Sequence, residues 1–95
     1  MNEQTIKLEF PKDLSKLAGN RYGKKIFDEQ VKGIIDYSKN ITFVLPDGID
    51  RVASSFIQGF FDSIMLELGW SGIQEKINFQ TKIDDFKSFV MDNLR

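Results

Sequence analysis

Hydrophobic and polar residues alternate near the beginning of the chain. The apolar positions are separated by charged ones, in the order Ile6, Lys7, Leu8, Glu9 and Phe10. This period of two predicts a β-strand with one buried face over residues 5–10, and Pro11 ends it. The connection over residues 12–22 is long enough to contain a turn or a second short strand around Leu14 and Leu17.

From Gly23 onward, apolar residues recur three and four positions apart, as they do on one face of a helix. These residues are Ile26, Phe27, Val31, Ile34 and Ile35. We therefore expect a first helix from Gly23 to near Ser38. The next run, residues 41–45, is almost wholly apolar and rich in β-branched residues, and it ends at Pro46. This composition predicts a central strand that is covered on both faces.

Residues 47–51 are typical of a loop, and the broad apolar stripe after them predicts a second helix that Gly69 ends. The stripe consists of Phe56, Ile57, Phe60, Phe61, Ile64, Met65 and Leu68. Gly59 lies within this helix, where a glycine costs about 1 kcal/mol relative to alanine. We therefore expect Gly59 to admit close packing of a neighbouring strand or helix.

A weaker alternation predicts a more polar third strand over residues 73–79, and the last apolar positions predict a final helix over residues 86–94. Thr81 and Asp84 have the spacing of a capping box for this helix. Strands that alternate with helices indicate an α/β fold with a mainly parallel or mixed sheet and right-handed crossovers, in two or three layers. We expect a single domain over residues 1–95.

Composition narrows the classes of partner and compartment. The chain has 95 residues, a net charge of -1 and no cysteine. We therefore expect a cytoplasmic protein, monomeric or homodimeric, that does not bind nucleic acid. No apolar run approaches the roughly 20 residues that span a bilayer, and the first residues have no signal-peptide pattern, so we expect no association with a membrane.

The chain also contains no histidine. It thus lacks the side chain that titrates near neutral pH, the thiolate nucleophile and the usual zinc ligands. We expect no enzymatic activity, no catalytic residue, no metal site and no cofactor. The acidic pairs at 28–29 and 84–85 are interpreted as solvated, because adjacent helical residues point about 100° apart and do not converge on one ion.

The segment from Gly19 to Lys25 has the spacing G-x-x-x-G, which is not that of a phosphate-binding loop. Its cations are Arg21, Lys24 and Lys25. We interpret the segment as a turn into the first helix with exposed lysines. The alternative is anion binding by the three cations, as in a small-ligand or nucleotide sensor. With Lys12 and Lys16, they make the N-terminal connection basic, a charge that would attract an acidic partner.

The loop over residues 47–55 joins the carboxyl end of the central strand to the most apolar helix. In open α/β sheets, ligands and partners commonly bind at this end of the strands. Ser55 and Gln58 have the spacing of a capping box, which predicts that Ser55 is the helix N-cap. Ser54 would then lie just outside the helix, either as a passive turn residue or as a site for a phosphate at the positive end of the helix.

The run from Ile41 to Phe61, ITFVLPDGIDRVASSFIQGFF, resembles the central strand, loop and helix of STAS-like domains, the fold of bacterial anti-sigma factor antagonists. It is most similar to small STAS-like proteins of unknown function in which a Ser-Phe pair opens the helix. The resemblance covers about half of the chain, and the flanks match by element order alone.

This resemblance implies a non-enzymatic regulatory module that docks on a protein partner, often an ATPase-fold kinase or anti-sigma-like protein. It also implies a switch by phosphorylation at the start of the helix, where Ser54 matches, although Ala53 stands where antagonists usually have Asp. The residues expected to bind the partner are Asp47, Asp50, Arg51, Ser54, Ser55 and Gln58. The alternative is an assembly module that forms a homodimer through the polar third strand at a sheet edge.

Overall fold

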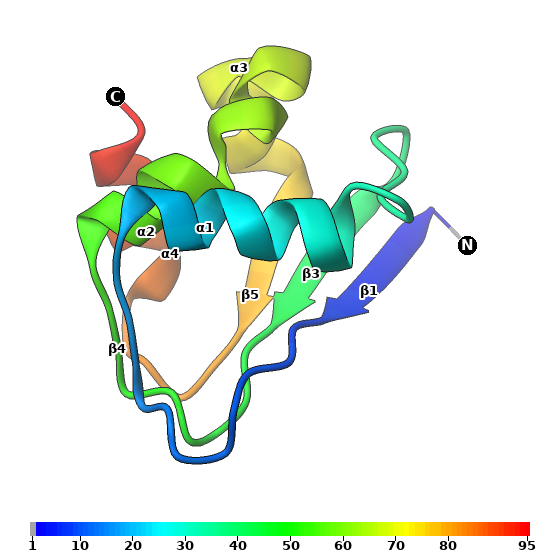
Figure 1. Cartoon of the computed structure of the whole chain (residues 1–95). Helices are drawn as coiled ribbons and strands as arrows, with labels where there is room; N and C mark the ends of the chain where they lie inside the picture. The colour runs from blue at the N-terminus through cyan, green and yellow to red at the C-terminus, as the bar shows by residue number, and fades with distance from the viewer. Residues whose placement is uncertain (1) are drawn as a thin grey trace.

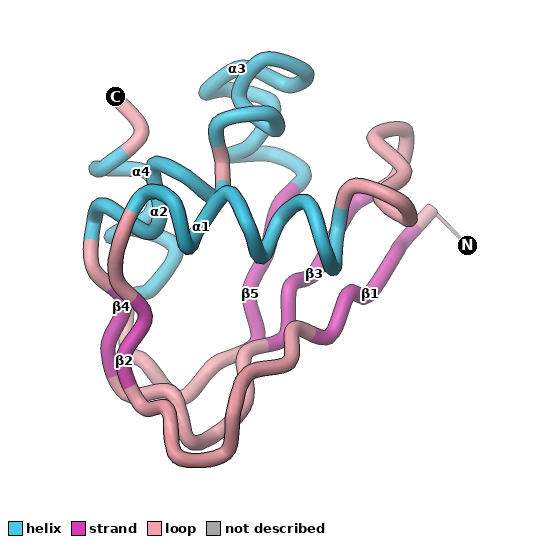
Figure 2. The backbone as a smooth tube through the Cα atoms, in the orientation of Figure 1, coloured by secondary structure: helices cyan, strands magenta, loops and turns pink. Residues whose placement is uncertain are grey.

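Five strands form two separate parallel sheets in a computed structural model of the chain, which describes residues 2–95. In the first sheet, β1 (Glu3–Lys7), β3 (Asn40–Val44) and β5 (Ile77–Gln80) lie in the order β1-β3-β5. The second sheet pairs β2 (Lys16–Leu17) with β4 (Arg51–Val52), and Figure 2 shows this pair apart from the other three strands. The predicted α/β fold with a mainly parallel sheet is confirmed.

Three of the helices lie in connections between strands, and the fourth follows the last strand (Figure 1). α1 (Asn20–Ile26) continues into a π-helical turn, η1 (Phe27–Val31), before β3. α2 (Ser54–Phe60) and α3 (Asp62–Lys76) follow β4, and α4 (Phe86–Asn93) follows β5. Within residues 2–95, no helix is both long enough and apolar enough to cross a lipid bilayer.

Only one face of the three-stranded sheet is buried. Ile6 and Phe43 are partners in register on that face, and they are 2% and 1% exposed. The neighbouring row of Thr5, Thr42 and Asn78 points to the opposite face, because side chains alternate along a strand. These three residues are exposed or half-buried. β3 is central, as predicted, but the prediction that it is covered on both faces is wrong.

The core between the sheet and the helices is rich in phenylalanine. The ring of Phe43 lies 5.2 Å from that of Phe60 and 6.2 Å from that of Phe61, edge to face in both cases. Phe79 and Phe86 form a third edge-to-face pair at 5.0 Å. This geometry adds to the stabilisation from burial, because the positive edge of one ring meets the negative face of the next. The buried apolar side chains form one cluster.

The predicted second helix is in fact two helices. Phe61 has φ -92° and ψ 3°, which ends α2 and allows α3 to start in a new direction. Gly69 interrupts α3 with φ 70° and ψ 173°, a conformation open to glycine because it has no Cβ atom. Gly69 breaks the helix as predicted, but helical turns resume as far as Lys76. The prediction of a strand over residues 73–79 is therefore wrong in its first half, and β5 begins at Ile77.

The predicted first helix starts and ends earlier than expected. It begins at Asn20, and its π-helical turn ends at Val31, not near Ser38. Ile34, whose spacing extended the predicted helix, is 58% exposed and lies in the turn that follows. The helical spacing of apolar residues therefore continues in the sequence beyond Val31, although the helix itself ends there.

The two ends of the chain also differ from the predictions in detail. β1 ends at Lys7, so the alternating pattern as far as Phe10 continues beyond the paired strand. The predicted capping box before α4 does not form: the hydroxyl of Thr81 accepts the N–H of Ile83 at 3.2 Å. The N-cap of α4 is Asp85, which has left-handed dihedral angles and makes no side-chain capping bond.

Candidate docking surface

Two strand-to-helix junctions lie side by side at the start of α1 and α2. β2 and β4 pair with Lys16 opposite Arg51 and Leu17 opposite Val52. Leu17 and Val52 are buried and attach the pair to the core, whereas the two cations are exposed. The N–H of Ala53 donates to the carbonyl oxygen of Leu17 at 2.8 Å, which continues the pairing to the edge of both helices.

The backbones of α1 and α2 touch where the two helices meet. A Cβ atom on Gly59 would collide with the carbonyl oxygen of Asn20, and one on Gly23 would collide with that of Phe56. Neither position has room for a side chain larger than hydrogen. The prediction that Gly59 admits a close neighbour is confirmed, and the neighbour is α1. Tyr22 of α1 also faces α2, and its ring lies 5.8 Å from that of Phe56. Burial and the charge of Glu29 raise the pKa of the Tyr22 phenol.

Ser55 has a different role from the one its spacing predicts. The N-cap of α2 is Ala53, which makes no side-chain capping bond, and the helix begins at Ser54. The Ser55 hydroxyl oxygen instead accepts the N–H of Gly19 at 3.0 Å. The predicted capping box with Gln58 is therefore wrong. Ser55 joins the two strand-to-helix junctions, and Ser54 is the first helical residue instead of lying outside the helix.

The remaining residues predicted to bind a partner are at the surface. We call the following exposed residues of the β3–α2 connection and the start of α2 the docking surface: Asp47, Asp50, Arg51, Ser54 and Gln58. Ser54 and Gln58 are four residues apart and share one face of α2. Ser55 is half-buried and supports this surface from beneath.

One acidic residue of the docking surface already has a partner. The carboxylate of Asp50 pairs with the Nζ of Lys82 at 2.6 Å, and both side chains are largely exposed. Lys82 follows β5, so this ion pair connects the loop after β3 with the loop after β5. Lys82 could not be identified from the sequence, because no local pattern indicates which loops meet at the carboxyl ends of parallel strands.

The three cations proposed as an anion site do not surround a phosphate-binding turn. Arg21, Lys24 and Lys25 lie in α1 and are exposed. The N–H of Gly19, at the turn before α1, already donates to the hydroxyl oxygen of Ser55. Lys24 lines a shallow hollow of about 180 Å³ whose other walls include the acidic Asp28 and Asp62. This mixed charge favours the interpretation of exposed lysines over that of an anion sensor.

A larger hollow lies at the carboxyl ends of the three-stranded sheet. It has a volume of about 500 Å³ and includes the last residue of each strand, Lys7, Val44 and Gln80. Asp47 and Lys82 also line it. The docking surface therefore borders an open depression, which fits the general location of binding sites in open α/β sheets.

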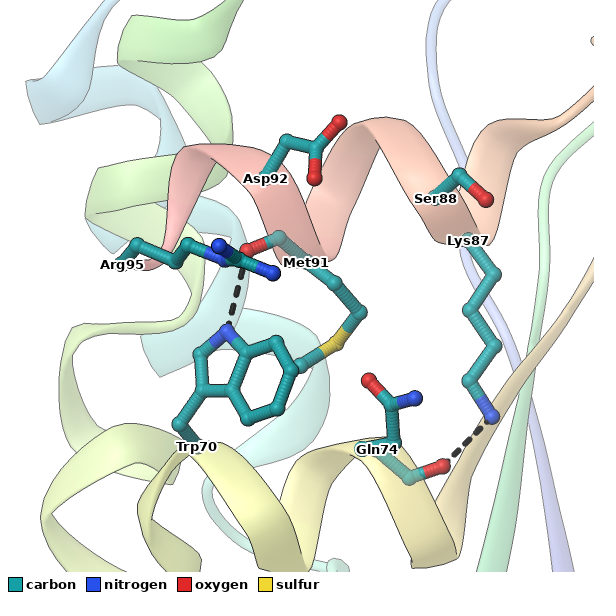
Figure 3. A pocket seen from close by; sticks show the side chains of 7 residues that line it. All are labelled: Trp70, Gln74, Lys87, Ser88, Met91, Asp92 and Arg95. Carbon is teal, nitrogen blue, oxygen red and sulfur yellow. Dashed lines mark hydrogen bonds between the residues drawn. The ribbon is translucent and has the colours of Figure 1, made fainter.

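A groove between α3 and α4, which no motif of the sequence predicts, is shown in Figure 3. The groove measures about 290 Å³, and Trp70 forms its base. The indole N–H donates to the carbonyl oxygen of Met91 at 3.0 Å, and the Arg95 guanidinium lies 5.3 Å from the ring centre. In the sequence, the single tryptophan directly after Gly69 is the only indication of this groove. The packing of α3 against α4 is a tertiary contact, and no local pattern predicts it.

β5 is an edge strand, as the assembly alternative requires, because it is hydrogen-bonded only to β3. However, the ammonium of Lys87 in α4 donates to the side chain of Asn78 at 3.2 Å and to the carbonyl oxygen of Gln74 at 2.7 Å. Lysines beside an edge strand oppose pairing with another chain. The arrangement therefore favours docking through the docking surface over pairing through β5.

Comparison with known proteins gives no match to a family model, to a curated protein or to a solved structure. The functional interpretation consequently depends on the residues and on the geometry described above.

Proposed function

We propose that the chain is a non-enzymatic regulatory module of the STAS-like type that binds a protein partner through the docking surface. The observation that carries this proposal is the rigid support beneath that surface. The hydrogen bond from Gly19 to Ser55 and the backbone contact between Gly59 and Asn20 fix α2 against the start of α1. Residues presented on a preorganised scaffold lose little conformational entropy on binding, which favours recognition of a folded partner.

The proposal includes the class of partner that the resemblance implies, an ATPase-fold kinase or anti-sigma-like protein, and a phosphorylation switch at Ser54. Ser54 is exposed and is the first residue of α2. A phosphate there would sit at the N-terminal end of α2, where negative charge is favourable by about 0.3–1 kcal/mol. The fold would therefore tolerate the modification, while the added charge would change what the docking surface accepts.

Ser55 is a poor substrate for the same switch. Its hydroxyl oxygen is half-buried and accepts the Gly19 N–H, so a phosphate at this position would break the link between the two junctions. The two adjacent serines thus have separate roles, with Ser54 available for modification and Ser55 holding the scaffold.

Affinity capture with matched variants tests the proposal. Wild-type protein, a docking variant (Ser54→Arg with Gln58→Arg) and a control variant (Thr5→Arg with Asn40→Arg) are used to capture proteins from an extract of the expressing cells. The control adds the same charge on the open face of the three-stranded sheet. A captured protein is then purified, and its affinity for each variant is measured by calorimetry.

We expect the docking variant to bind the purified partner at least tenfold more weakly than the wild type and the control variant to bind it equally well. We also expect Ser54→Asp to weaken binding and Ser54→Ala to preserve it. If the wild type and the docking variant retain the same proteins with the same affinity, the docking surface is not the binding site and the proposal is wrong.

A further inference from the structure

The exposed face of the β2–β4 pair carries two like charges directly opposite each other. Lys16 and Arg51 are partners in register, and both are exposed. Neighbouring strands lie about 4.8 Å apart, so the two side chains leave the ladder close together. Like charges at such positions destabilise a sheet. The paired residues beneath the sheet, Leu17 and Val52, are buried, and the register is therefore fixed by the core.

The protein does not neutralise this pair of cations. The ion pairs within residues 2–95 are Lys39 with Asp36 and Lys82 with Asp50. Asp50, the acidic residue adjacent to Arg51, is thus already paired with a third cation. Asp13 and Asp47 lie in the loops before β2 and β4, but neither forms an ion pair with Lys16 or Arg51.

We propose that Lys16 and Arg51 together bind the carboxylate of an Asp or Glu side chain from an acidic segment of the partner protein. This inference rests on the proposed function, since Arg51 belongs to the docking surface. A planar guanidinium binds a carboxylate through two parallel N–H groups, and the lysine ammonium beside it adds a second charge-assisted hydrogen bond. A bound carboxylate would relieve the repulsion between the two cations, so binding and local stability are coupled.

The charge of the chain selects a protein over a nucleic acid as the source of the anion. The net charge is -1, and two neighbouring cations match one carboxylate, whereas nucleic-acid surfaces require a long basic stripe. A steric argument agrees: the β2–β4 pair has two residues in each strand, which is too short to follow a polynucleotide backbone.

Two measurements on the whole chain test the inference. The first is the melting temperature of Lys16→Glu, which places opposite charges across the ladder, compared with Lys32→Glu, which makes the same charge change at an exposed lysine after η1. The second is a nuclear magnetic resonance titration of the backbone amides at low salt. The probes are an octaglutamate peptide, a (Gly-Ser)4 peptide as a neutral control, and a ten-residue thymidine oligonucleotide.

We expect Lys16→Glu to melt a few degrees above the wild type and Lys32→Glu to melt no higher than the wild type. We expect octaglutamate to shift the amides of residues 15–18 and 50–53, and Lys16→Glu to weaken this binding at least tenfold. The neutral peptide should cause no shifts. The inference is overturned if Lys16→Glu fails to raise the melting temperature, if Lys32→Glu weakens peptide binding equally, or if the oligonucleotide binds these amides more tightly than the peptide.

The affinity of the captured partner for the variants distinguishes failure of this inference from failure of the proposed function. If Ser54→Arg with Gln58→Arg weakens partner binding and Lys16→Glu does not, the partner binds at the docking surface. The inference that the paired cations bind its carboxylate is then wrong. If Lys16→Glu weakens partner binding and Ser54→Arg with Gln58→Arg does not, the paired cations recognise the partner's acidic segment but the rest of the docking surface is not where the partner binds.

Discussion

The hydroxyl oxygen of Ser55 accepts a hydrogen bond from the backbone N–H of Gly19, at 3.0 Å and across 36 residues of sequence. This bond lies between the end of β2 and the start of α2, so it joins the two junctions that support the docking surface. Loss of the hydroxyl leaves a part-buried N–H without its acceptor, which is the costly way to remove a hydrogen bond.

Ser55→Ala should therefore lower the free energy of unfolding by about 1 kcal/mol, equivalent to about 4–8 °C in melting temperature for a chain of this size. Ser54→Ala is the matched control, because Ser54 is exposed and makes no side-chain capping bond. It should change stability by less than about 0.5 kcal/mol. Urea denaturation followed by circular dichroism compares the two. Equal effects at both positions would contradict the linking role of Ser55.

Gly59→Ala should destabilise the protein by about 1–3 kcal/mol, because the added Cβ atom would collide with the Asn20 carbonyl oxygen and push α1 from α2. The sign is informative, since alanine in a helix without this contact would stabilise by up to about 1 kcal/mol. Gly48→Ala serves as the control, because no atom lies within 4 Å of a Cβ built there. A Gly59→Ala protein as stable as the wild type would show that the helices do not touch at this point.

Local periodicity was sufficient to predict β1, β3 and α4, and the alternation of strands with helices predicted the parallel arrangement. β4 was not predicted, because Arg51 was interpreted as part of a loop and a strand of two residues shows no period. Apolar alternation placed β1 within a few residues, and Gly59 correctly indicated close helix packing. The errors arose where tertiary contacts override a local pattern. Ile34 continues the helical period of the first helix, yet it is 58% exposed because the chain turns after Val31.

Part of the candidate site could also be predicted from the sequence. The location of the candidate site after β3 follows from the general rule for parallel sheets. Of its six candidate residues, all except the half-buried Ser55 are exposed. The role of Ser55 was not predictable, because a Ser-x-x-Gln spacing is satisfied locally in a capping box whereas the actual partner, Gly19, lies in another element. The opposition of Lys16 and Arg51 similarly depends on the register of β2 and β4, which two-residue strands do not reveal in sequence.

Trp70→Phe should lower the free energy of unfolding by about 1 kcal/mol, because the carbonyl oxygen of Met91 loses the indole N–H as its donor. Arg95→Ala removes the cation above the same ring and should cost about 0.5 kcal/mol or less at this exposed position. Circular dichroism is the suitable probe, since Trp70 is the single tryptophan of the chain. A larger effect for Arg95→Ala than for Trp70→Phe would contradict this account of the α3–α4 groove.

Asp36 should titrate below the usual range of an aspartate. The Ser38 hydroxyl donates to its carboxylate at 2.6 Å and the Ser38 N–H donates at 3.0 Å, so hydrogen bonding, led by the hydroxyl, lowers the pKa of Asp36. Because this pKa is lowered on folding, the carboxylate's contribution to stability is present above its unfolded-state pKa and is lost as the pH falls through the folded-state pKa.

Ser38→Ala should raise the pKa of Asp36 toward its ordinary value without restoring it fully, because the backbone N–H of residue 38 still donates to the carboxylate. The side-chain carboxyl carbon of Asp36, followed by nuclear magnetic resonance from neutral to acidic pH, reports this change directly. Ser71→Ala, at an exposed serine in α3, should leave the titration of Asp36 unaltered. An Asp36 pKa that is the same in Ser38→Ala as in the wild type would mean that the hydroxyl does not hold the carboxylate in solution, and that its ion pair with Lys39 at 3.9 Å or the backbone N–H lowers the pKa instead.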